Sequence, residues 1–508
     1  DSIDYIDNIF SDECNLVSYF YLGNPFGDEE EGRSSVVSMD VRDTVQSILP
    51  SLMKVFTTGE KVVEFVPTGA EDVAMAEQAT DYINHVFMQQ NKGFTLMYNA
   101  FKDALIRKAG VIKFYWDDSK EVVTETYTDL TQEAANLLMQ DDDVYASALK
   151  EKPVGEPIMV QPAVMDEMGN VVQEPVLEQP MAYDLELKRE ITKGRIKCEA
   201  LPPEEFLIDR RAKSLEEATI VAHRKMATVS ELVAMGYDFD EVMKHAGEDF
   251  QFDTNSEFYT RNPVATVQGL TAKDDANKRV LYIEAYVRAD YDGDGIAELR
   301  KVCTMGDAYE VFRNEPFDHM PFAAFCPDPE PHTFFGQSLA DITMDIQRIK
   351  SAILRNQLDS LAQSIHPRMA VVEGQANLED VLNSEVGGII RMRAPNMVQS
   401  FSQPFVGQQA FPMMAYMDEV KQSRTGINRA ASGLDADALQ STTKTAVAAT
   451  VTAARQHVEL IARIFAETGM TDLFKGLLKL SILHQDQPTM VRLRGDFVPV
   501  DPRAWNAN

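Results

Sequence analysis

One segment constrains the fold more than any other: residues 338–365 carry a helical pattern long enough to reach beyond an ordinary domain. Apolar residues recur in it every three or four positions, with a slip after Ile353. Ser338 and Asp341 form a start like a capping box, and His366-Pro367 ends the run. At 1.5 Å per residue the helix would be about 40 Å long. Its polar face mixes both charge signs, so we expect one side to pack against helices and the other to face water.

The composition indicates a globular chain of several domains. It has 508 residues, of which 44% are hydrophobic and 25% are charged, which argues against disorder and fibrous structure. At roughly 100–200 residues per domain, we expect three or four domains or sub-domains. No run of about 18 apolar residues occurs, so we expect no membrane-spanning helix. Four scattered cysteines predict free thiols and no disulfide framework.

The negative charge is confined to the first two thirds of the chain. The whole sequence has 80 acidic and 48 basic residues, a net charge of −32, but residues 331–508 hold 17 of each, which leaves 63 and 31 in residues 1–330. Residues 117–187 alone hold 17 acidic residues against three lysines. We interpret this insertion as a mobile, solvated acidic loop between two strands. The balanced C-terminal third could approach phosphates.

The rest of the first 330 residues alternates between helical and strand patterns. Periodic apolar residues predict helices at 38–57, with Ser38 as the N-cap, and at 71–91 and 94–109. Thr228 is expected to cap a short helix. Alternating or continuous apolar runs predict strands at residues 110–116, 183–198, 206–209, 218–224, 280–287 and 297–302. The chain therefore mixes helices and sheets.

An acidic turn separates the last two of these strands. Asp290, Asp292 and Asp294, followed by Gly295, match the opening of a calcium-binding loop, in which oxygen ligands at every second residue surround one hard cation. The twelfth position, however, is Lys301 instead of a bidentate Glu, and strands flank the turn. Asp-Gly steps between alternating runs are also typical of a tight hairpin. Both interpretations stay open, a hairpin turn and a structural Ca²⁺ or Mg²⁺ site, and we favour the turn.

The C-terminal third continues with a small strand-rich segment and more helices. Residues 368–405 include the strand-like runs 369–372 and 387–390 and the basic pair Arg391 and Arg393. A helix is predicted at 413–428, followed by a break around Gly433. Another long helical pattern runs from about 441 to 484, with an interruption at Gly469.

Sequence signatures of catalysis are missing. The chain contains no phosphate-binding P-loop and no G-x-G-x-x-G after a strand. H-E-x-x-H and G-x-S-x-G are absent as well. We therefore expect a structural or interaction protein, with no cofactor and no catalytic residue.

Several short segments occur in a characteristic order. They are Val41-Arg-Asp-Thr-Val-Gln46, Gly110-Val-Ile-Lys-Phe-Tyr-Trp116, Pro203-Glu-Glu-Phe-Leu-Ile-Asp209, Leu232-Val-Ala-Met-Gly-Tyr237, Asp290-Tyr-Asp-Gly-Asp-Gly295, Phe335-Gly-Gln-Ser-Leu339 with the long helix after it, and the break from Gly433 to Thr443. Their order over nearly the whole chain resembles that of the portal proteins of tailed double-stranded DNA bacteriophages, closest to those of short-tailed phages.

The resemblance implies an α+β portal fold and a ring of twelve subunits. Residues 1–330 would form a mixed α/β wing with the acidic insertion 117–187, and residues 331–367 the first helix of a long stem. Residues 368–410 would form a small α/β clip, 411–428 the second stem helix, 429–443 a channel loop, and 444–508 a helix returning to the wing and the start of the crown. The crown of the family would continue beyond Asn508, so we expect it to be truncated here.

The resemblance also implies a function and partners. Such a ring occupies one capsid vertex of the virion, is assembled in the host cytoplasm, and is the conduit through which double-stranded DNA is packaged, retained and ejected. Its expected partners are other copies of the chain, double-stranded DNA, the terminase large subunit, the major capsid protein, the scaffolding protein and the head-tail adaptor, but no membrane.

Within that resemblance, a few residues are candidates for contact with DNA or docking. Arg424, Arg429 and Lys444 flank the expected channel loop with Gly433 and could touch phosphates transiently, or they could pair with Asp435 or Asp437 of a neighbouring subunit. Arg391 and Arg393 could dock the packaging motor and the tail adaptor, or they could belong to a solvated sheet edge.

Two alternative functions remain. One is another ring-forming head-tail adaptor, although adaptors are usually much shorter. The other is a metal-dependent nuclease that would use Asp290, Asp292, Asp294 and Glu298, since clustered carboxylates can hold two cations for phosphodiester chemistry. The hairpin context of these acids argues against it.

Overall fold

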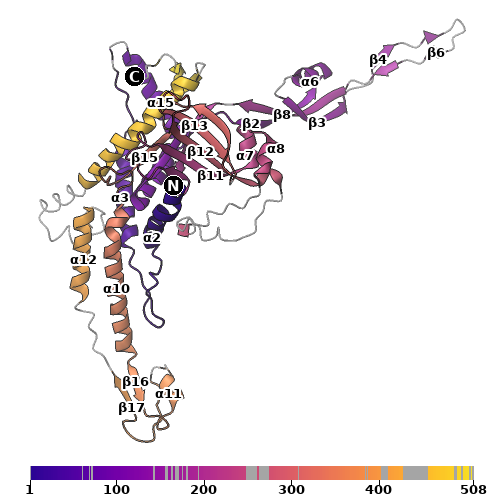
Figure 1. Ribbon diagram of the computed structural model, residues 1–508. Coiled ribbons are helices and arrows are strands. Elements are labelled where there is room, and N and C mark those ends of the chain that lie inside the picture. Colours follow the sequence, from indigo (N-terminus) through magenta and orange to yellow (C-terminus); the bar gives the residue numbers. More distant parts are fainter. Residues whose placement is uncertain are drawn as a thin grey trace.

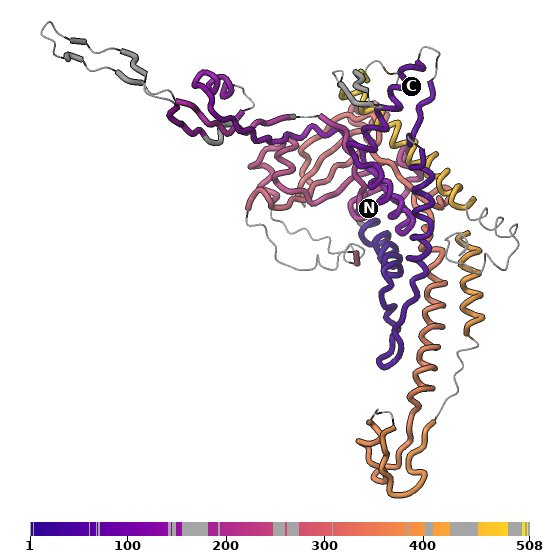
Figure 2. Tube along the Cα trace, turned by 180° about the vertical axis from the view of Figure 1, so that it is seen from behind, coloured from indigo at the N-terminus to yellow at the C-terminus, as the bar shows by residue number. Residues whose placement is uncertain are grey.

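The computed structural model shows an elongated protein, in which a wide body carries a long helix with a small distal module at its far end (Figure 1). A thin arm of strands leaves the body on another side, as the view from behind also shows (Figure 2). The structure describes all residues except 1, 60, 68, 70–71, 141–143, 155–157, 162–163, 166–170, 174–175, 179–180, 193, 247–259, 262–273, 307, 384, 386, 402–409, 427–455, 486–488, 494–495, 503–504 and 506–508.

The body is built around a three-stranded antiparallel sheet of order β15-β1-β9. Its central strand β1 (Gly110–Asp117) is mostly buried, as the continuous apolar run predicts, and lies between β15 (Phe322–Phe325) and β9 (Arg195–Leu201). The helices that pack with this sheet in the largest apolar cluster include α2 (Ser11–Leu22), α3 (Asp40–Thr57), α4 (Val73–His85), α5 (Gly93–Arg107) and α15 (Thr471–His484).

Helix α3 illustrates how the periodic pattern becomes packing. Its apolar residues at spacings of three and four, from Val41 to Leu52, all face the core. The expected N-cap is wrong: the helix begins at Asp40 with Met39 as its N-cap. The hydroxyl of Ser38 instead donates to the Asp40 carboxylate. The same carboxylate also accepts hydrogen bonds from lysines of two other helices, as described below.

A second, five-stranded antiparallel sheet completes the body, with order β10-β11-β12-β13-β14. The strands are β10 (Phe206–Ile208), β11 (Ile220–Thr228), β12 (Arg279–Ala289), β13 (Glu298–Met305) and β14 (Glu310–Pro316). The first four confirm the strands predicted in this region, and β14 adds a fifth. Thr228 forms the predicted cap, a capping box at the start of α7 (Val229–Ala234), and α8 (Phe239–Lys244) follows. The N-terminal π-turn η1 (Tyr5–Phe10), which follows α1 (Ser2–Asp4), is fastened to this sheet by a buried bidentate pair between Asp7 and Arg224, at 2.6 and 2.8 Å.

The interpretation of the acidic insertion as a loop is wrong. Residues 120–192 fold into paired strands and one short helix, and we call this region the arm. A sheet of order β2-β8-β3 is formed by β2 (Lys120–Leu130), β3 (Val144–Pro153) and β8 (Met181–Thr192), with α6 (Gln132–Leu138) beside it. Leu185 and Leu187 make a small apolar core with Ala135 of α6. Two further hairpins extend the arm, β4 (Ile158–Gln161) with β7 (Val176–Glu178) and β5 (Val164–Met165) with β6 (Val171–Gln173).

The long helix α10 (Leu339–Ile365) confirms the strongest prediction, including the capping box of Ser338 and Asp341 and the end at His366. Its first half packs into the body, where Thr343, Gln347 and Ser351 are fully buried. The distal module, residues 368–401, pairs β16 (Arg368–Val371) with β17 (Val398–Phe401) and adds the short helix α11 (Leu378–Leu382). The strand expected at 387–390 does not form. Gly387 has a φ of 85°, which is a left-handed backbone conformation and not an extended one.

Helix α12 (Ala410–Thr425) runs back beside α10 and ends at Gly426, where the backbone is left-handed. The chain is helical again at 456–465. It forms a short π-helix, η6 (Ala466–Met470), at the interruption predicted for Gly469, and continues as α15. A final hairpin joins β18 (Thr489–Leu493) and β19 (Asp496–Val500). A Cβ atom on Gly426 would lie 3.1 Å from Cβ of His457, so the two described ends that flank residues 427–455 touch each other.

Candidate functional site

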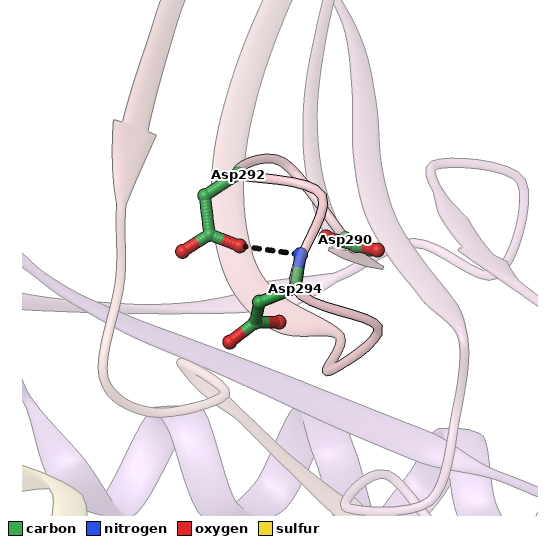
Figure 3. Close-up of side chains that lie close together, drawn as sticks. All are labelled: Asp290, Asp292 and Asp294. Atoms are coloured by element: carbon green, nitrogen blue, oxygen red, sulfur yellow. Dashed lines mark hydrogen bonds between the residues drawn. The ribbon is translucent and has the colours of Figure 1, made fainter.

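The acidic turn between β12 and β13 brings Asp290, Asp292 and Asp294 together on the surface (Figure 3). One carboxylate oxygen of each lies within 4.8 Å of the others, and all three residues are exposed. Glu298, the fourth acid of the nuclease hypothesis, is not a member of this group. The turn therefore places three potential ligands near one point, but not the four acids that the two-metal alternative would use.

The same three carboxylates accept hydrogen bonds from backbone N–H groups within the turn. Asp290 accepts the backbone N–H groups of Gly293 and Gly295 at 2.6 and 2.9 Å. Asp292 accepts the N–H of Asp294 at 3.1 Å, the bond drawn in Figure 3. Asp294 in turn accepts the N–H of Ile296 at 2.7 Å. Each Asp thus stabilises a tight turn whose glycines have positive φ, a role that needs no cation.

Arg424, a candidate for phosphate contact, joins the two long helices. Its Nη1 donates to the carboxylate oxygens of Asp345 on α10 at 2.7 and 2.8 Å, and to the carbonyl of Ile342 at 3.2 Å. The side chain is still 43% exposed. The pairing expected for this arginine was with Asp435 or Asp437 of a neighbour, whereas the structure gives it a partner within its own chain.

The other channel candidates, Arg429, Gly433 and Lys444, lie outside the described residues. The contact between Gly426 and His457 bears on them, because it fixes where the chain leaves α12 and where it is described again. The two described ends that flank this segment therefore lie side by side, where α12 meets the helix at 456–465.

The two distal arginines differ from each other. Arg391 forms a bidentate pair with Asp380 at 2.7 and 2.9 Å, and its own backbone N–H donates to the same carboxylate at 3.1 Å. The hydrogen bond from Arg391 lowers the pKa of Asp380 to about 2. Arg393 is exposed and has no carboxylate partner among the described residues; its backbone N–H bonds to the carbonyl of Gln375. Both line an open depression of about 360 Å³ beside residues 374–377.

Comparison with known families shows which family the chain matches. A family model described as "Phage SU10 portal protein" matches residues 1–508, the whole chain.

The chain belongs to the SU10 phage portal protein family.

The resemblance found in the sequence is thereby confirmed, and a portal protein is favoured over a head-tail adaptor. Portal proteins are in general structural and not enzymatic, and the family implies an oligomeric assembly at a capsid vertex. The mixed α/β fold of this portal protein is compatible with that family. None of the helices that the structure describes is long and apolar enough to cross a membrane.

The portal protein leaves many apolar side chains uncovered on its long helix and distal module. On α10, Leu358, Leu361 and Ile365 are 40%, 43% and 61% exposed. In the distal module, Leu382 and Ile389 are 79% and 85% exposed. Clustered exposed apolar side chains of this kind mark interaction surfaces.

A network of charged residues that the sequence did not reveal lies where α12 meets the body. Asp40 of α3 accepts hydrogen bonds from Lys350 of α10 and Lys421 of α12, and Lys350 also bonds to Asp418 of α12. Asp40 is 310 positions from Lys350 and 381 from Lys421, and Lys350 is 68 from Asp418, so each looks like an ordinary surface charge in its own helix. No local pattern could have identified them.

Proposed function

We propose that the chain is a subunit of a twelve-membered portal ring, the conduit for double-stranded DNA during packaging, retention and ejection. The observation that carries this proposal is the surface of α10. Ser351, Leu358 and Ile365 follow each other at intervals of seven, so they share one helix face. Ser351 is buried against the body, whereas Leu358 and Ile365 are exposed beyond it.

The buried face of α10 therefore continues as an apolar stripe after the body ends. In a ring, each subunit presents one face to the different face of its neighbour, and a neighbouring copy would cover this stripe. The exposed Phe411 and Tyr416 on α12, at 63% and 56%, support the same reading. We assign the body with its arm, residues 1–330, to the wing, α10 with its flanks (331–367) to the first stem helix and 368–410 to the clip.

The remaining regions follow from the same assignment. Residues 411–428, which contain α12, would be the second stem helix, 429–443 the channel loop, and 444–508 the helix returning to the wing and the start of the crown. A conduit must let the duplex slide, and each lysine or arginine on a phosphate adds a salt-dependent grip. The equal numbers of acidic and basic residues in 331–508 agree with a weak grip.

The distal module would dock the terminase large subunit and later the head-tail adaptor, while the wing would meet the major capsid protein and the scaffolding protein. Since Arg391 is held by Asp380, we propose that Arg393 makes the docking contact and Arg391 braces α11. Arg393→Ala should weaken motor binding and leave the distal module intact. Arg391→Ala should increase hydrogen exchange in α11. Equal loss of binding in both variants, with no change in exchange, would contradict this division.

The mass of the assembly tests the ring. Native mass spectrometry, followed by negative-stain images, should find a species near twelve times the 56.9 kDa chain with a central hole. Leu358→Glu combined with Ile365→Glu should shift the mass towards the monomer, because charge replaces the apolar stripe. Leu137→Glu on the arm, where the leucine is 72% exposed, is the matched control and should leave the mass unchanged. A compact monomer or dimer under assembly conditions would overturn the proposal.

Deletion tests the channel loop separately. Removing residues 432–437 should leave the ring intact and impair packaging or retention of DNA. Collapse of the ring on deletion would make the segment architectural instead.

A further inference from the structure

Four charged side chains from three helices meet where α12 joins the body. Lys350 Nζ lies 2.7 Å from Oδ1 of Asp40 and 2.7 Å from Oδ1 of Asp418. Lys421 Nζ lies 2.7 Å from the same oxygen of Asp40 and 3.9 Å from Asp418. Two positive and two negative groups therefore alternate around one point, with Asp40 on α3, Lys350 on α10 and the other two on α12. We call this group the α12 latch.

Burial makes the α12 latch sensitive to the loss of any member. The side chains of Asp40 and Lys350 are 2% and 9% exposed, and those of Asp418 and Lys421 18% and 21%. Burial alone would raise the pKa of Asp40, but hydrogen bonds from Lys350 and Lys421 outweigh it and lower the pKa below the usual value. Burial alone would lower the pKa of Lys350, but its hydrogen bonds to Asp40 and Asp418 outweigh this effect and raise the pKa. Asp40 and Lys350 are thus held in their charged forms, and each needs its partners.

Apolar contacts contribute little to the attachment of α12. Among its described side chains only Met417 and Thr425 are buried, and Met417 belongs to none of the apolar clusters found in the described part of the chain. The first turn of α10 and one face of α3, by contrast, contribute buried residues to the main core. A second polar tie, between Arg424 and Asp345, also joins α12 to α10.

We propose that α12 is a detachable helix, held on the body by the α12 latch and released from it as a unit while α3 and α10 stay folded. An apolar attachment would survive changes in charge and ionic strength, whereas ion pairs weaken with both. The proposal does not depend on the ring. In a portal, it would allow the second stem helix to change position without unfolding the wing.

Hydrogen exchange measured by mass spectrometry tests this on the purified protein, with its mass checked by light scattering. Asp418→Asn is nearly isosteric, removes one charge, and leaves the pair of Asp40 and Lys350 in place. Exchange in peptides covering 410–425 should become about tenfold faster or more. Exchange in 40–57 and 339–351 should stay unchanged. Glu467→Gln, which breaks an exposed pair with Arg463, is the matched control and should change none of these peptides.

A second variant keeps the proposal falsifiable if α12 exchanges quickly in the wild type. Asp418→Leu with Lys421→Leu removes one charge of each sign and substitutes an apolar attachment. Raising NaCl from about 0.1 to 1 M, which shortens the Debye length from about 10 to 3 Å, should accelerate α12 exchange in the wild type and much less in this variant, where only the pair of Arg424 and Asp345 still ties α12 to α10. Equal salt sensitivity in both proteins, or an equal rise in α3 and α10 in Asp418→Asn, would overturn the proposal.

Discussion

Lys113 Nζ on β1 lies 2.8 Å from Oε2 of Glu284 on β12, so one buried ion pair connects the two sheets of the body. Lys301 binds the other oxygen of Glu284 at 2.9 Å, and the hydroxyl of Tyr286 also donates to it. Burial favours the neutral acid, but Lys113 and Lys301 hold the pKa of Glu284 well below its usual value. The sheets are therefore joined by a carboxylate that stays ionised in the core.

Glu284→Gln should destabilise the protein by about 3–5 kcal/mol, because it leaves the buried ammonium of Lys113 without a full counter-charge. The midpoint of chemical unfolding, followed by fluorescence, measures this. Arg463→Gln breaks an exposed ion pair and should leave the unfolding midpoint at its wild-type value. If both variants unfold at the wild-type midpoint, the ion pair between the sheets does not stabilise the protein.

Glu205 should make stability depend on pH. Burial, followed by the carboxylates of Glu204 and Glu199, raises its pKa to about 7, above the value of 4.5 in an unfolded chain. The folded state therefore binds the proton more tightly. The stabilising contribution of Glu205 is full below about pH 4.5 and is lost as the pH rises through about 7.

His223, whose Nε2 lies 3.2 Å from Glu205, works in the opposite direction. Burial and Lys113 lower its pKa well below 6.5, so its contribution grows as the pH rises towards 6.5. Glu205→Gln removes only the first effect, and the variant should gain about 1–3 kcal/mol over the wild type between pH 5 and pH 8. Unfolding midpoints at both pH values check this; a constant difference would refute it.

Gly110 should not tolerate a side chain. A Cβ there would lie 1.8 Å from the carbonyl oxygen of Ala100 on α5, and a backbone atom cannot move aside as a side chain can. Gly110→Ala should force α5 away from β1 and cost about 3 kcal/mol or more. Gly59→Ala, where the nearest atom is 3.2 Å away, should cost less than about 1 kcal/mol. Soluble yield and unfolding midpoints compare the two variants.

The acidic turn should keep its shape without a cation. Asp290→Ala removes two turn hydrogen bonds and should lower the free energy of unfolding by about 1–2 kcal/mol. Millimolar Ca²⁺ or Mg²⁺ should leave the wild-type melting temperature unchanged, as a calorimetric scan can show. A cation-dependent rise that Asp292→Asn abolishes would establish the structural site. Magnesium-dependent cleavage of DNA that is lost in Asp292→Ala would revive the nuclease alternative.

The sequence predicted the elements whose signals are local. The helix at 338–365 is marked by its own apolar period, by the capping residues at its start and by His366-Pro367 at its end. The hairpin around the acidic turn is marked by alternating apolar residues and Asp-Gly steps. The strands of the arm are not predicted, because the high charge of this segment indicates a solvated loop, although its β-branched residues favour a sheet. Val122, Thr124, Thr126 and Thr128 alternate along β2 in a way typical of a strand. Charge on the exposed face of a sheet does not prevent pairing.

The site was predictable only in part, because ion pairs are formed by folding. Arg424 was identified as a charge near the expected channel, but its partner Asp345 lies 79 positions away. Arg391 and Arg393 look equivalent in the sequence, and only the position of α11 gives one of them a carboxylate. Within the α12 latch only Asp418 and Lys421 follow a local spacing, whereas Asp40 and Lys350 become neighbours only after the body has folded.

The contact between Gly426 and His457 has a consequence for how the protein can vary. When two anchor points touch, the chain between them can be lengthened, shortened or exchanged without pulling the helices apart, and doubling its length costs only about 0.6 kcal/mol in closure entropy. The described framework of body and long helices therefore sets by itself the distance between the two ends of residues 427–455. An insertion or deletion between these two residues can thus leave α12 beside the helix at 456–465.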